Sequence, residues 1–447
     1  MSSEWTALTI GDLVRQGEAS VQTGPFGSQL HSCDYVAVGT PVIPTEAIGR
    51  GPILDIDVPM VDSSKAAELS RHRLRSGDIL FARRGAQATG LAAIVSRRYE
   101  GALCGTGALL LRTQSPRVDP HYLAMFLSCD ISYLWLRAHA VGAVMPNLNT
   151  DIIKALPLLL PSIEEQRELA GFNSALDGRI ALLRETNATL EAIAQALFKS
   201  WFVDFDPVRA KQQGLPPAGM DEATAALFPD SFEESALGLV PKGWSVRPVG
   251  DAVKCVGGAT PDTKEPSYWS PEEHSWTTPK DLSGLPAPVL LSTERRLSTK
   301  GLAKIGSGLL PVGTLLMSSR APIGYLAIAQ VPVAINQGYI AMSPGSLLPP
   351  LYMLFWCQQN MEGIKSRANG STFMEISKKA FRPIPALVPS SPVVEAFLAV
   401  ASPLFSLLVS KELQAQTLAT LRHTLLPRLI SGQLRLPEAL VEIEEAA

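Results

Sequence analysis

Cysteine is scarce in this chain, and no pattern ties its cysteines into a framework. Five cysteines stand at positions 33, 104, 129, 255 and 357, and no two of them form a Cys-x-x-Cys pair. An odd number at such spacings argues against a disulfide framework and against a zinc site, and it fits a reducing compartment. The six histidines are isolated as well, so we expect them in core or surface positions and not as metal ligands.

Segments for export or membrane insertion are also missing. Between Met1 and Ile10 no basic stretch precedes an apolar run, which argues against a secretory signal peptide. The longest apolar stretch, Val393 to Val409, is interrupted by Glu395 and Pro403 and is short for a membrane span. We therefore expect a cytoplasmic protein without membrane contact.

Motifs of nucleotide-binding and hydrolytic enzymes are absent. There is no Gly-x-x-x-x-Gly-Lys-Ser/Thr, Gly-x-Gly-x-x-Gly, His-Glu-x-x-His or Gly-x-Ser-x-Gly. An adenine methyltransferase needs an Asn/Asp-Pro-Pro-aromatic loop, and Asp206-Pro-Val208 lacks the second proline and the aromatic, so we interpret it as a helix-ending turn. Asp262-Thr-Lys264 fits a short nuclease fragment that is frequent by chance, and we interpret it as a polar loop. No catalytic centre or metal site is expected.

Composition indicates a folded chain of more than one domain. Apolar residues make up 46% of the 447 residues and charged residues 18%, which is typical of globular proteins. A chain of this length is too long for one compact core, so we expect at least two domains. The 34 glycines and 35 prolines predict many turns between short elements.

Positive charge is concentrated in parts of the chain, although the net charge is −3. Residues 1–161 carry 14 basic and 14 acidic side chains, and residues 241–389 carry 15 basic and 9 acidic ones. Residues 162–240 carry 6 basic and 13 acidic side chains, and residues 390–447 carry 4 and 6. This distribution is typical of globular blocks that contact phosphate, joined by segments that do not.

An internal repeat organises the chain. Gly142-Ala-Val-Met-Pro-Asn-Leu148 aligns with Gly370-Ser-Thr-Phe-Met-Glu-Ile376, and the same offset continues without a gap into the segment that follows. Upstream, with small shifts, Gly77-Asp-Ile-Leu-Phe-Ala-Arg-Arg84 resembles Gly313-Thr-Leu-Leu-Met-Ser-Ser-Arg320. The order of the chain is therefore block, helix, linker, block, helix.

Each block is predicted to be a mixed α+β domain. Short β-type runs bounded by glycine and proline recur, such as Ile79 to Phe81, Leu91 to Val95 and Tyr325 to Ala329. Helices are expected to follow over Tyr122–Leu136 and Leu351–Lys365. The predicted fold class is α+β, with two similar domains related by an internal pseudo-two-fold repeat.

A long helix is predicted after each block. Ser162 is a favourable N-cap, and Glu164 and Glu165 suit the positive end of the helix dipole. Both helices carry a narrow apolar seam at heptad spacing, so they most simply pack together as an antiparallel, coiled-coil-like pair. Asn187 is either a tolerated surface substitution or a device that fixes the register. The seam residues are Leu176, Ile180, Leu183, Asn187, Leu190, Leu197 and Trp201 in the first helix and Leu404, Leu408, Leu418, Leu425 and Leu429 in the second.

The second seam is less regular, because Lys411 and Arg422 interrupt it. A linker rich in proline, glycine and acid runs from Asp204 to Lys242 and is expected to wrap along the helix pair. We divide the chain into a first domain (1–161), a first long helix (162–201), a linker (202–241), a second domain (242–389) and a second long helix with a C-terminal tail (390–447).

Several segments together carry a family resemblance. Trp201-Phe-Val-Asp-Phe-Asp-Pro207, followed by Gly238-Leu-Val-Pro-Lys-Gly-Trp244, resembles the central conserved region of the specificity subunits of type I restriction-modification systems. The resemblance covers nearly the whole chain and occurs twice in the same order. The other segments typical of that family are Thr23–Ser28, Gly257–Pro261, Ser318–Gly324, Asn336–Gly338, Gly370–Ser377 and Leu425–Leu434.

This resemblance implies two target-recognition domains, each reading one half of a bipartite site in double-stranded DNA. It implies that the helices act as a fixed-length spacer and as the dock for two methyltransferase subunits, through which restriction and translocase subunits join. S-adenosylmethionine, ATP and Mg²⁺ would then belong to the partner subunits, and this chain would be a non-catalytic component with no cofactor of its own.

Three alternative functions remain at this point. A type II specificity subunit, whose partner is a fused methyltransferase-nuclease, uses the same architecture. A stand-alone DNA-modifying enzyme would need methyl-donor and base-holding motifs that are missing. A scaffold without a DNA role would leave the duplicated block and its uneven positive charge unexplained.

Candidate DNA-reading residues are basic and amide side chains in glycine-punctuated loops, because arginine reads guanine with two hydrogen bonds and asparagine or glutamine reads adenine. For any single arginine, a solvated turn is an equally good interpretation. In the first block the candidates are Arg83, Arg84 and Gln87, with Arg71, Arg73 and Arg75 nearby.

The second block has its own candidates. Asn336 and Gln337 follow a β-type run and can equally cap or bridge strands. Trp269 and Trp276 can stack on the sugar-phosphate edge, although large aromatics more often pack in the core. The base-reading candidates are Lys280, Ser319, Arg320, Asn336 and Gln337, and the expected phosphate contacts are Lys378, Lys379 and Arg382.

Helix length is expected to set the spacing between the two half-sites. About 38 helical residues span about 57 Å at 1.5 Å per residue. Inserting about four residues between Thr189 and Ala192 adds roughly 5.4 Å, which equals about one and a half base pairs.

Overall fold

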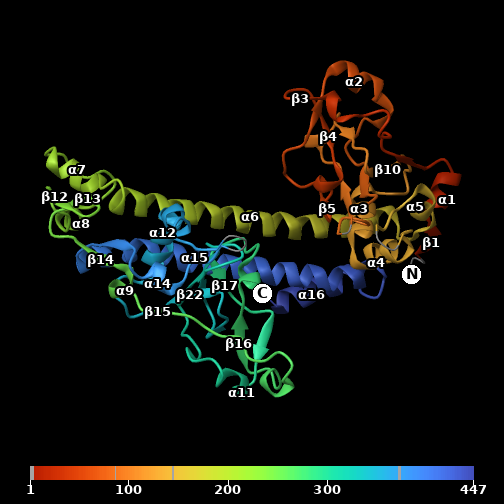
Figure 1. Cartoon of the computed structure of the whole chain (residues 1–447). Coiled ribbons are helices and arrows are strands. Elements are labelled where there is room, and N and C mark those ends of the chain that lie inside the picture. Colours follow the sequence, from red (N-terminus) through yellow and green to blue (C-terminus); the bar gives the residue numbers. More distant parts are fainter. Residues whose placement is uncertain (1–4, 86, 143–144, 371–373, 447) are drawn as a thin grey trace. The chain divides into compact units, whose positions relative to one another are not determined.

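The computed structural model describes residues 5–85, 87–142, 145–370 and 374–446 (Figure 1). The chain forms two compact units. Unit 1 comprises the chain up to Arg179 together with the segment from Thr417 onward, and unit 2 comprises Ile180–Gln416. Each unit therefore combines a mixed α+β block with parts of both long helices.

Unit 1 is built on a five-stranded sheet in the order β2-β10-β7-β8-β5. Its neighbouring strands are antiparallel except for β5 and β8, which are parallel. The strands are β2 (Ala19–Thr23), β10 (Ala108–Thr113), β7 (Ile79–Ala82), β8 (Ala92–Ile94) and β5 (Gly51–Pro52).

Both faces of this sheet are buried, which explains why its central strands are continuous apolar runs. Alternate residues of β7 enter different cores, because successive side chains of a strand point to opposite faces. Ile79 and Phe81 belong to the core shared with the helices of unit 1, whereas Leu80 and Ala82 belong to a second core on the opposite face.

Two further sheets complete unit 1. In the four-stranded sheet β3-β6-β4-β9, strands β4 and β9 are parallel, with Val42 opposite Leu103. Its strands are β3 (Tyr35–Val36), β6 (Met60–Val61), β4 (Thr40–Ile43) and β9 (Leu103–Cys104), while β1 (Thr6–Thr9) pairs with β11 (Pro157–Leu160). The shorter helices are α1 (Ile10–Arg15), α2 (Ser63–Glu68), α3 (Pro120–Ser128), α4 (Asp130–His139), α5 (Thr150–Ala155) and the 3-10 turns η1 (Ser32–Asp34), η2 (Thr45–Ala47), η3 (Ser70–His72) and η4 (Arg97–Tyr99).

Unit 2 repeats this design. Its five-stranded sheet has the order β15-β22-β19-β20-β17, again with a single parallel pair, β17 and β20. The three-stranded sheet β18-β16-β21 again contains a parallel pair, β16 and β21. The strands are β15 (Cys255–Val256), β22 (Tyr339–Met342), β19 (Leu315–Ser318), β20 (Leu326–Ala329), β17 (Val289–Leu290), β18 (Arg295–Leu297), β16 (His274–Thr277), β21 (Ala334–Ile335) and the pair β14 (Ser245–Pro248) and β23 (Pro385–Val388). The predicted α+β fold and internal repeat are thereby confirmed.

In both units, the helix predicted to follow the strands is interrupted. Each predicted helix, Tyr122–Leu136 and Leu351–Lys365, is in fact two helices. Cys129 is extended between α3 and α4, and the Asn360 side chain donates to the Trp356 carbonyl at 2.8 Å where α12 ends. The helices of unit 2 are α9 (Val249–Ala252), α10 (Pro279–Leu282), α11 (Thr299–Leu302), α12 (Pro350–Gln359), α13 (Met361–Lys365), α14 (Lys378–Phe381) and η5 (Pro266–Tyr268).

The linker is structured and packs within unit 2. It contains α7 (Asp206–Gln212), α8 (Glu222–Ala226) and a hairpin of β12 (Phe232–Ser235) and β13 (Gly238–Pro241). Asp206-Pro207 starts α7, so its interpretation as a helix-ending turn is wrong. The residue just before α7, Phe205, has a left-handed backbone conformation with φ of 58°. Pro207 then lies in the first turn of α7, where proline is favourable.

The two long helices are α6 (Ile163–Phe202) and α15 (Ser391–Ile430), and α16 (Leu436–Ala446) follows the second. The predicted cap is confirmed, because the backbone N–H of Glu165 donates to Ser162 Oγ at 3.2 Å. Within unit 2, Asn187 lies against Glu412 and Phe198 against Phe397, so rising residue numbers meet falling ones and the helices are antiparallel. Unit 1 shows the same direction, because Glu165 forms an ion pair with Arg435, just after α15, and Asp177 forms one with Arg422.

The predicted seam residues line the buried sides of both helices. Leu190 and Leu408 share one apolar cluster with Val289, and Trp201 packs edge-on against Phe228 with ring centroids 5.0 Å apart. Leu176, Ile180, Leu183, Asn187, Leu190, Trp201, Leu408, Leu425 and Leu429 are buried, whereas Leu197, Leu404 and Leu418 are half-buried.

Asn187 is not a surface substitution. It is 1% exposed, and so is Glu412 on the other helix. The Asn187 amide donates to Glu412 Oε2 at 3.5 Å, and the Gln416 amide donates to Glu412 Oε1 at 3.3 Å. The buried polar residue of the second helix at this level is therefore Glu412, whereas its neighbour Lys411, which was expected to interrupt the seam, is half-buried.

One helix among the described residues, α15, is long and apolar enough to cross a membrane by length and composition alone. This differs from the prediction that its apolar run, Val393 to Val409, is short for a membrane span. The contacts of this helix give it a different role, because Val393, Phe397 and Ala401 belong to the main apolar core of unit 2. The Phe397 ring packs against the rings of Phe198 and Phe202 on the other long helix.

Candidate nucleic-acid interface

Three loops in each unit are held together by the same backbone hydrogen bonds. In unit 1 the N–H of Gly105, after β9, donates to the Ile43 carbonyl at 3.0 Å, and the matching bond in unit 2 joins Asn336 to Thr277 at 3.1 Å. This match places the loop after β9 and the loop after β21 in equivalent positions.

The loops that follow β7 and β19 are matched in the same way. The N–H of Arg83 donates to the Gly107 carbonyl at 3.0 Å, and the N–H of Ser319 donates to the Gly338 carbonyl at 2.8 Å. Arg83 is therefore the counterpart of Ser319.

An isolated bridge follows in each unit, between Arg84 and Asn147 in unit 1 and between Arg320 and Glu375 in unit 2. Residues 143–144 and 371–373 of the repeated motif lie outside the described residues. The bridges nevertheless fix Arg84 and Arg320 as counterparts, as the sequence repeat predicted.

A glycine allows a further segment to approach these loops. A Cβ on Gly24 would lie 2.1 Å from the Gly105 carbonyl oxygen, and a Cβ on Gly258 would lie 1.7 Å from the Ile335 carbonyl oxygen. Only glycine permits such distances between backbone and backbone. This accounts for Gly24 and Gly258, which lie in two of the segments that carry the family resemblance.

In unit 1 the loops enclose a cavity of about 260 Å³. Arg84 from the loop after β7, Glu46 from η2 and Thr106 from the loop after β9 all line it, together with Tyr35 and Met145. Donors, acceptors and apolar groups thus converge from separate segments, which is the chemistry that distinguishes base edges.

The candidates of the first block fall into two groups. Arg83 is half-buried, and its Nε donates to Asn147 Oδ1 at 3.0 Å and to the Leu148 carbonyl at 3.1 Å, so its side chain holds the loop together. The exposed candidates are Arg71, Arg73, Arg75, Arg84 and Gln87. Of these, only Arg84 lines the cavity.

The candidates of the second block are more strongly tied to neighbours. Arg320 lies 3.9 Å from the Glu375 carboxylate, and Lys280 pairs with Glu294 at 2.8 Å. Ser319 is 3% exposed, so its side chain does not face solvent.

The two amides of this block form local contacts. Asn336 Oδ1 accepts the Gly338 N–H at 2.8 Å, which is the capping role considered for it. The exposed Gln337 accepts the Thr260 hydroxyl proton at 2.7 Å through Oε1.

The sequence did not indicate Glu46, Tyr35 and Thr106 as candidate site residues. Their types are common on ordinary surfaces, and the repeat is least similar where they lie. The only available signal was positional, because Glu46 follows β4 at the same distance as Lys280 follows β16. That signal requires the strand register, which the sequence alone does not supply.

A family model now decides the identity of the chain. The model described as the type I restriction modification DNA specificity domain matches residues 37–192 and 241–393, which together exceed half of the chain. The chain belongs to the type I restriction-modification DNA specificity family. The resemblance inferred from the sequence is confirmed, and the chain is a DNA-specificity subunit.

Individual relatives agree with this assignment. The chain is 24% identical over 410 residues to the type I restriction enzyme HindI specificity subunit of Haemophilus influenzae, covering 82% of this chain and 88% of that protein. It is 34% identical over 189 residues to the MjaIX specificity subunit of Methanocaldococcus jannaschii, covering 42% and 44%. The type II alternative is not favoured.

The fold is also that of a solved specificity subunit. The type I restriction-modification S subunit from M. genitalium is similar with a TM-score of 0.55 at 16% identity, covering 96% of each chain. At this identity the likeness establishes the fold.

Trp269 and Trp276 of the specificity subunit pack against each other. Trp276 is 2% exposed, and it packs edge-on against Trp269 with centroids 5.1 Å apart. Their indole N–H groups donate to the carbonyls of Ala259 and Asp262, and the Arg295 guanidinium lies 3.5 Å above the Trp269 ring. This arrangement favours the core interpretation over stacking on DNA.

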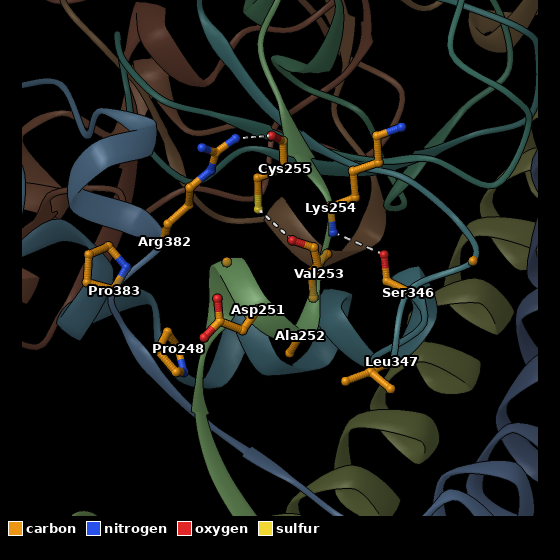
Figure 2. A pocket seen from close by; sticks show the side chains of 12 residues that line it. Pro248, Asp251, Ala252, Val253, Lys254, Cys255, Ser346, Leu347, Arg382 and Pro383 are labelled. Carbon is orange, nitrogen blue, oxygen red and sulfur yellow. Dashed lines mark hydrogen bonds between the residues drawn. The ribbon is translucent and has the colours of Figure 1, made fainter.

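A cavity of about 850 Å³ lies in unit 2 beside α9 and the start of β15 (Figure 2). Arg382 lines it, and its guanidinium donates to the Cys255 carbonyl at 2.7 Å. Lys254 is anchored nearby through its backbone N–H, which donates to Ser346 Oγ at 3.0 Å. Arg382 therefore joins α14 to β15, whereas Lys378 and Lys379 are exposed on α14.

The buried cysteines are poor nucleophiles. Burial raises the pKa of Cys104 to about 12 and that of Cys255 to about 11, so both thiols are protonated at neutral pH. Asp262 accepts the Lys264 backbone N–H at 2.9 Å, which fits the polar loop expected for this triplet. Across the ranges that the structure describes, no three His, Cys, Asp or Glu residues gather into a group able to hold a metal ion.

Proposed function

We propose that each unit reads one half of a bipartite DNA site with its matched loops. In unit 1 these are the loops after β4, β7 and β9, and in unit 2 the loops after β16, β19 and β21. One observation carries the proposal: the same backbone hydrogen bonds place an arginine, Arg84 or Arg320, at the same position in both units. Arginine is the side chain that most often reads guanine.

The long helices are proposed to dock two methyltransferase subunits. Leu182 and Ile193 on α6 are 52% and 50% exposed, and eleven residues make about three turns, so they lie on one side of the helix. Val400 and Leu407 on α15 are 48% and 46% exposed and one heptad apart. Exposed apolar rows of this kind support contact with a protein partner.

The division of chemistry follows from that assembly. The methyltransferase subunits would supply S-adenosylmethionine chemistry, and the restriction and translocase subunits that join through them would use ATP and Mg²⁺. This chain would act without a cofactor, in the cytoplasm, as the non-catalytic reader of the complex.

The test is methylome sequencing of a host that carries this chain with its methyltransferase subunit. The expected result is one motif of two defined half-sites separated by unspecified base pairs. Replacing the three loops of unit 2 by those of another family member should change one half-site and leave the other intact. Methylation of a continuous motif, or a change in both half-sites, would contradict the proposal.

A further inference from the structure

The matched loops contain one position at which the two units carry opposite charges. Ile43 and Thr277 are counterparts, because each accepts the same loop hydrogen bond. Both strands then enter a turn in which a backbone N–H donates three residues back, from Ala47 to Pro44 and from Asp281 to Thr278. Counting along these turns makes Glu46 the counterpart of Lys280.

The surroundings of Glu46 leave its carboxylate available. Glu46 is exposed at the cavity that Arg84 also lines. Within the described ranges its side chain makes no ion pair or hydrogen bond, whereas Lys280 pairs with Glu294 at 2.8 Å. The negative charge of Glu46 acts on Tyr35, whose pKa is raised by burial and by the carboxylates of Asp34 and Glu46.

A free carboxylate on a DNA-reading surface favours bases that offer a hydrogen-bond donor and disfavours bases that offer only acceptors. When ionised it accepts hydrogen bonds and donates none. In the major groove only cytosine N4 and adenine N6 offer donors, while guanine and thymine offer acceptors. Lysine has the opposite preference and binds guanine O6 and N7. An acid that meets no donor is left beside DNA unpaired, which disfavours the wrong base.

We propose that Glu46 is a base-reading residue of unit 1 that accepts a hydrogen bond from the amino group of a cytosine or an adenine, and that Lys280 selects an acceptor-bearing base at the matched position of the other half-site. The proposal rests on the proposed function, in which each unit reads one half-site. It adds one pair of matched residues by which two similar units select different bases.

The experiment uses the complex of this chain with its methyltransferase subunit and duplexes randomised at each half-site in turn. Binding selection with Glu46→Gln should lose about 5- to 150-fold of the preference for one amino-bearing base in one half-site. Glu46→Lys should move that position towards guanine. Lys280→Glu should alter the other half-site only.

Glu100→Gln and Glu100→Lys are the matched controls, because Glu100 is an exposed acid of unit 1 that does not line the cavity. They should leave every selected position unchanged. The proposal is overturned if the Glu46 variants raise affinity equally for all duplexes, since that marks a purely electrostatic effect. It is also overturned if the Glu46 variants select the same half-site sequences as the unsubstituted complex.

Failure of the proposed function is recognised separately, from the unsubstituted complex. If that complex selects no bipartite sequence, the two-unit reading is wrong before any variant is compared. If it selects two half-sites and the Glu46 variants select the same ones, the two-unit reading stands and the role of Glu46 is refuted. Thermal melts of each variant establish that the chain is folded, and both Glu46 variants are expected to melt with the unsubstituted chain.

Discussion

Arg84 and Arg320 occupy matched positions but have different neighbours. The bridge partner of Arg320 is Glu375, whose carboxylate lies 3.9 Å away, whereas the bridge partner of Arg84 is the neutral Asn147. Replacing either arginine by alanine should weaken binding to the cognate site by about 1–3 kcal/mol and relax one position of the corresponding half-site. Competition binding with single-base variants of the site measures this, and an equal loss on every sequence would mark a phosphate contact instead.

Arg83→Ala is the matched control for Arg84→Ala, because the two residues are adjacent and equally charged. Its Nε bonds to Asn147 and Leu148 hold the loop after β7 in place. Losing a charged donor from a half-buried site costs about 1.5–3 kcal/mol. We therefore expect a lower unfolding midpoint for Arg83→Ala and an unchanged midpoint for Arg84→Ala.

His72 gives unit 1 a dependence on pH. It is 2% exposed, and burial, followed by the charge of Arg71, holds its pKa below the ordinary 6.5 against the opposing effect of a backbone contact with Thr23. The unfolded chain thus binds a proton more readily than the folded chain. Stability should be constant above about pH 6.5 and fall as the pH drops below that value.

The comparison for this prediction is His72→Leu, whose side chain is apolar and cannot titrate. Urea unfolding of the two proteins between pH 5 and 8 should give curves that diverge only on the acid side. Parallel curves over the whole range would show that another group causes the acid sensitivity.

At the scale of elements, the buried polar layer of the helix pair combines a carboxylate and an amide. Replacing both Asn187 and Glu412 by leucine should leave the chain as stable or stabilise it by about 1–4 kcal/mol, because a packed apolar pair avoids the desolvation of a charge. Asn187→Leu alone should destabilise it by about 1–3 kcal/mol, since Glu412 then loses a buried donor. Denaturant midpoints measure both.

The reason to keep such a layer is register. Only one alignment of the two seams brings the amide opposite the carboxylate, whereas leucines pack in several. A cysteine pair replacing Leu190 and Leu408 should therefore form one crosslinked product in the natural background and a mixture in the double-leucine background. A single product in both backgrounds would remove the register argument.

Assembly is expected to depend on the exposed rows of α6 and α15. Leu182→Asp with Ile193→Asp should abolish co-purification with the methyltransferase subunit while the melting temperature changes little, because both side chains are about half exposed. Leu190→Asp is the contrasting variant, since it places a charge in a buried cluster and should unfold the helix pair. Normal assembly of the first variant would place the dock elsewhere.

The elements were predictable wherever one rule decided them. Heptad spacing and a cap residue were enough for α6, and apolar runs were enough for β7, β8 and β20. The interruptions at Cys129 and Asn360 were missed because apolar periodicity continues through them, while the break depends on one backbone torsion and one side-chain bond. For the site, the sequence predicted only the residue types. It could not separate Arg84 from Arg83, because the hydrogen bonds that occupy the Arg83 guanidinium, to Asn147 and Leu148, are known only from the structure.

For the whole molecule, helix length is the property expected to set the gap between half-sites. The sequence-based insertion between Thr189 and Ala192 would lengthen α6 alone and slide its seam past α15, given that Leu190 meets Leu408. Four residues should therefore be added to both helices, between Asn187 and Leu190 and between Leu408 and Glu412. Each addition is about one helical turn, roughly 5.4 Å, and the seam continues with slight unwinding.

The methylated motif of this double insertion should keep both half-sites and gain one or two unspecified base pairs, at about 3.4 Å for each pair. Methylome sequencing gives the answer directly. A fully active variant with its original spacing would refute the helix pair as the spacer, and altered half-site bases would refute the separation of reading from spacing.

Unit 1 draws its core from segments that are far apart in the order of synthesis. Leu425, Leu429 and Leu434 pack with residues such as Ile10 and Tyr122. On the ribosome, the first block therefore emerges long before the residues that complete it, by roughly 13–54 s at about 5–20 residues per second. Unit 2 is continuous in the chain and is complete before that segment arrives. The reader of the first half-site is thus finished last, and chains interrupted before Thr417 leave the ribosome with an apolar surface for chaperones and proteases to recognise.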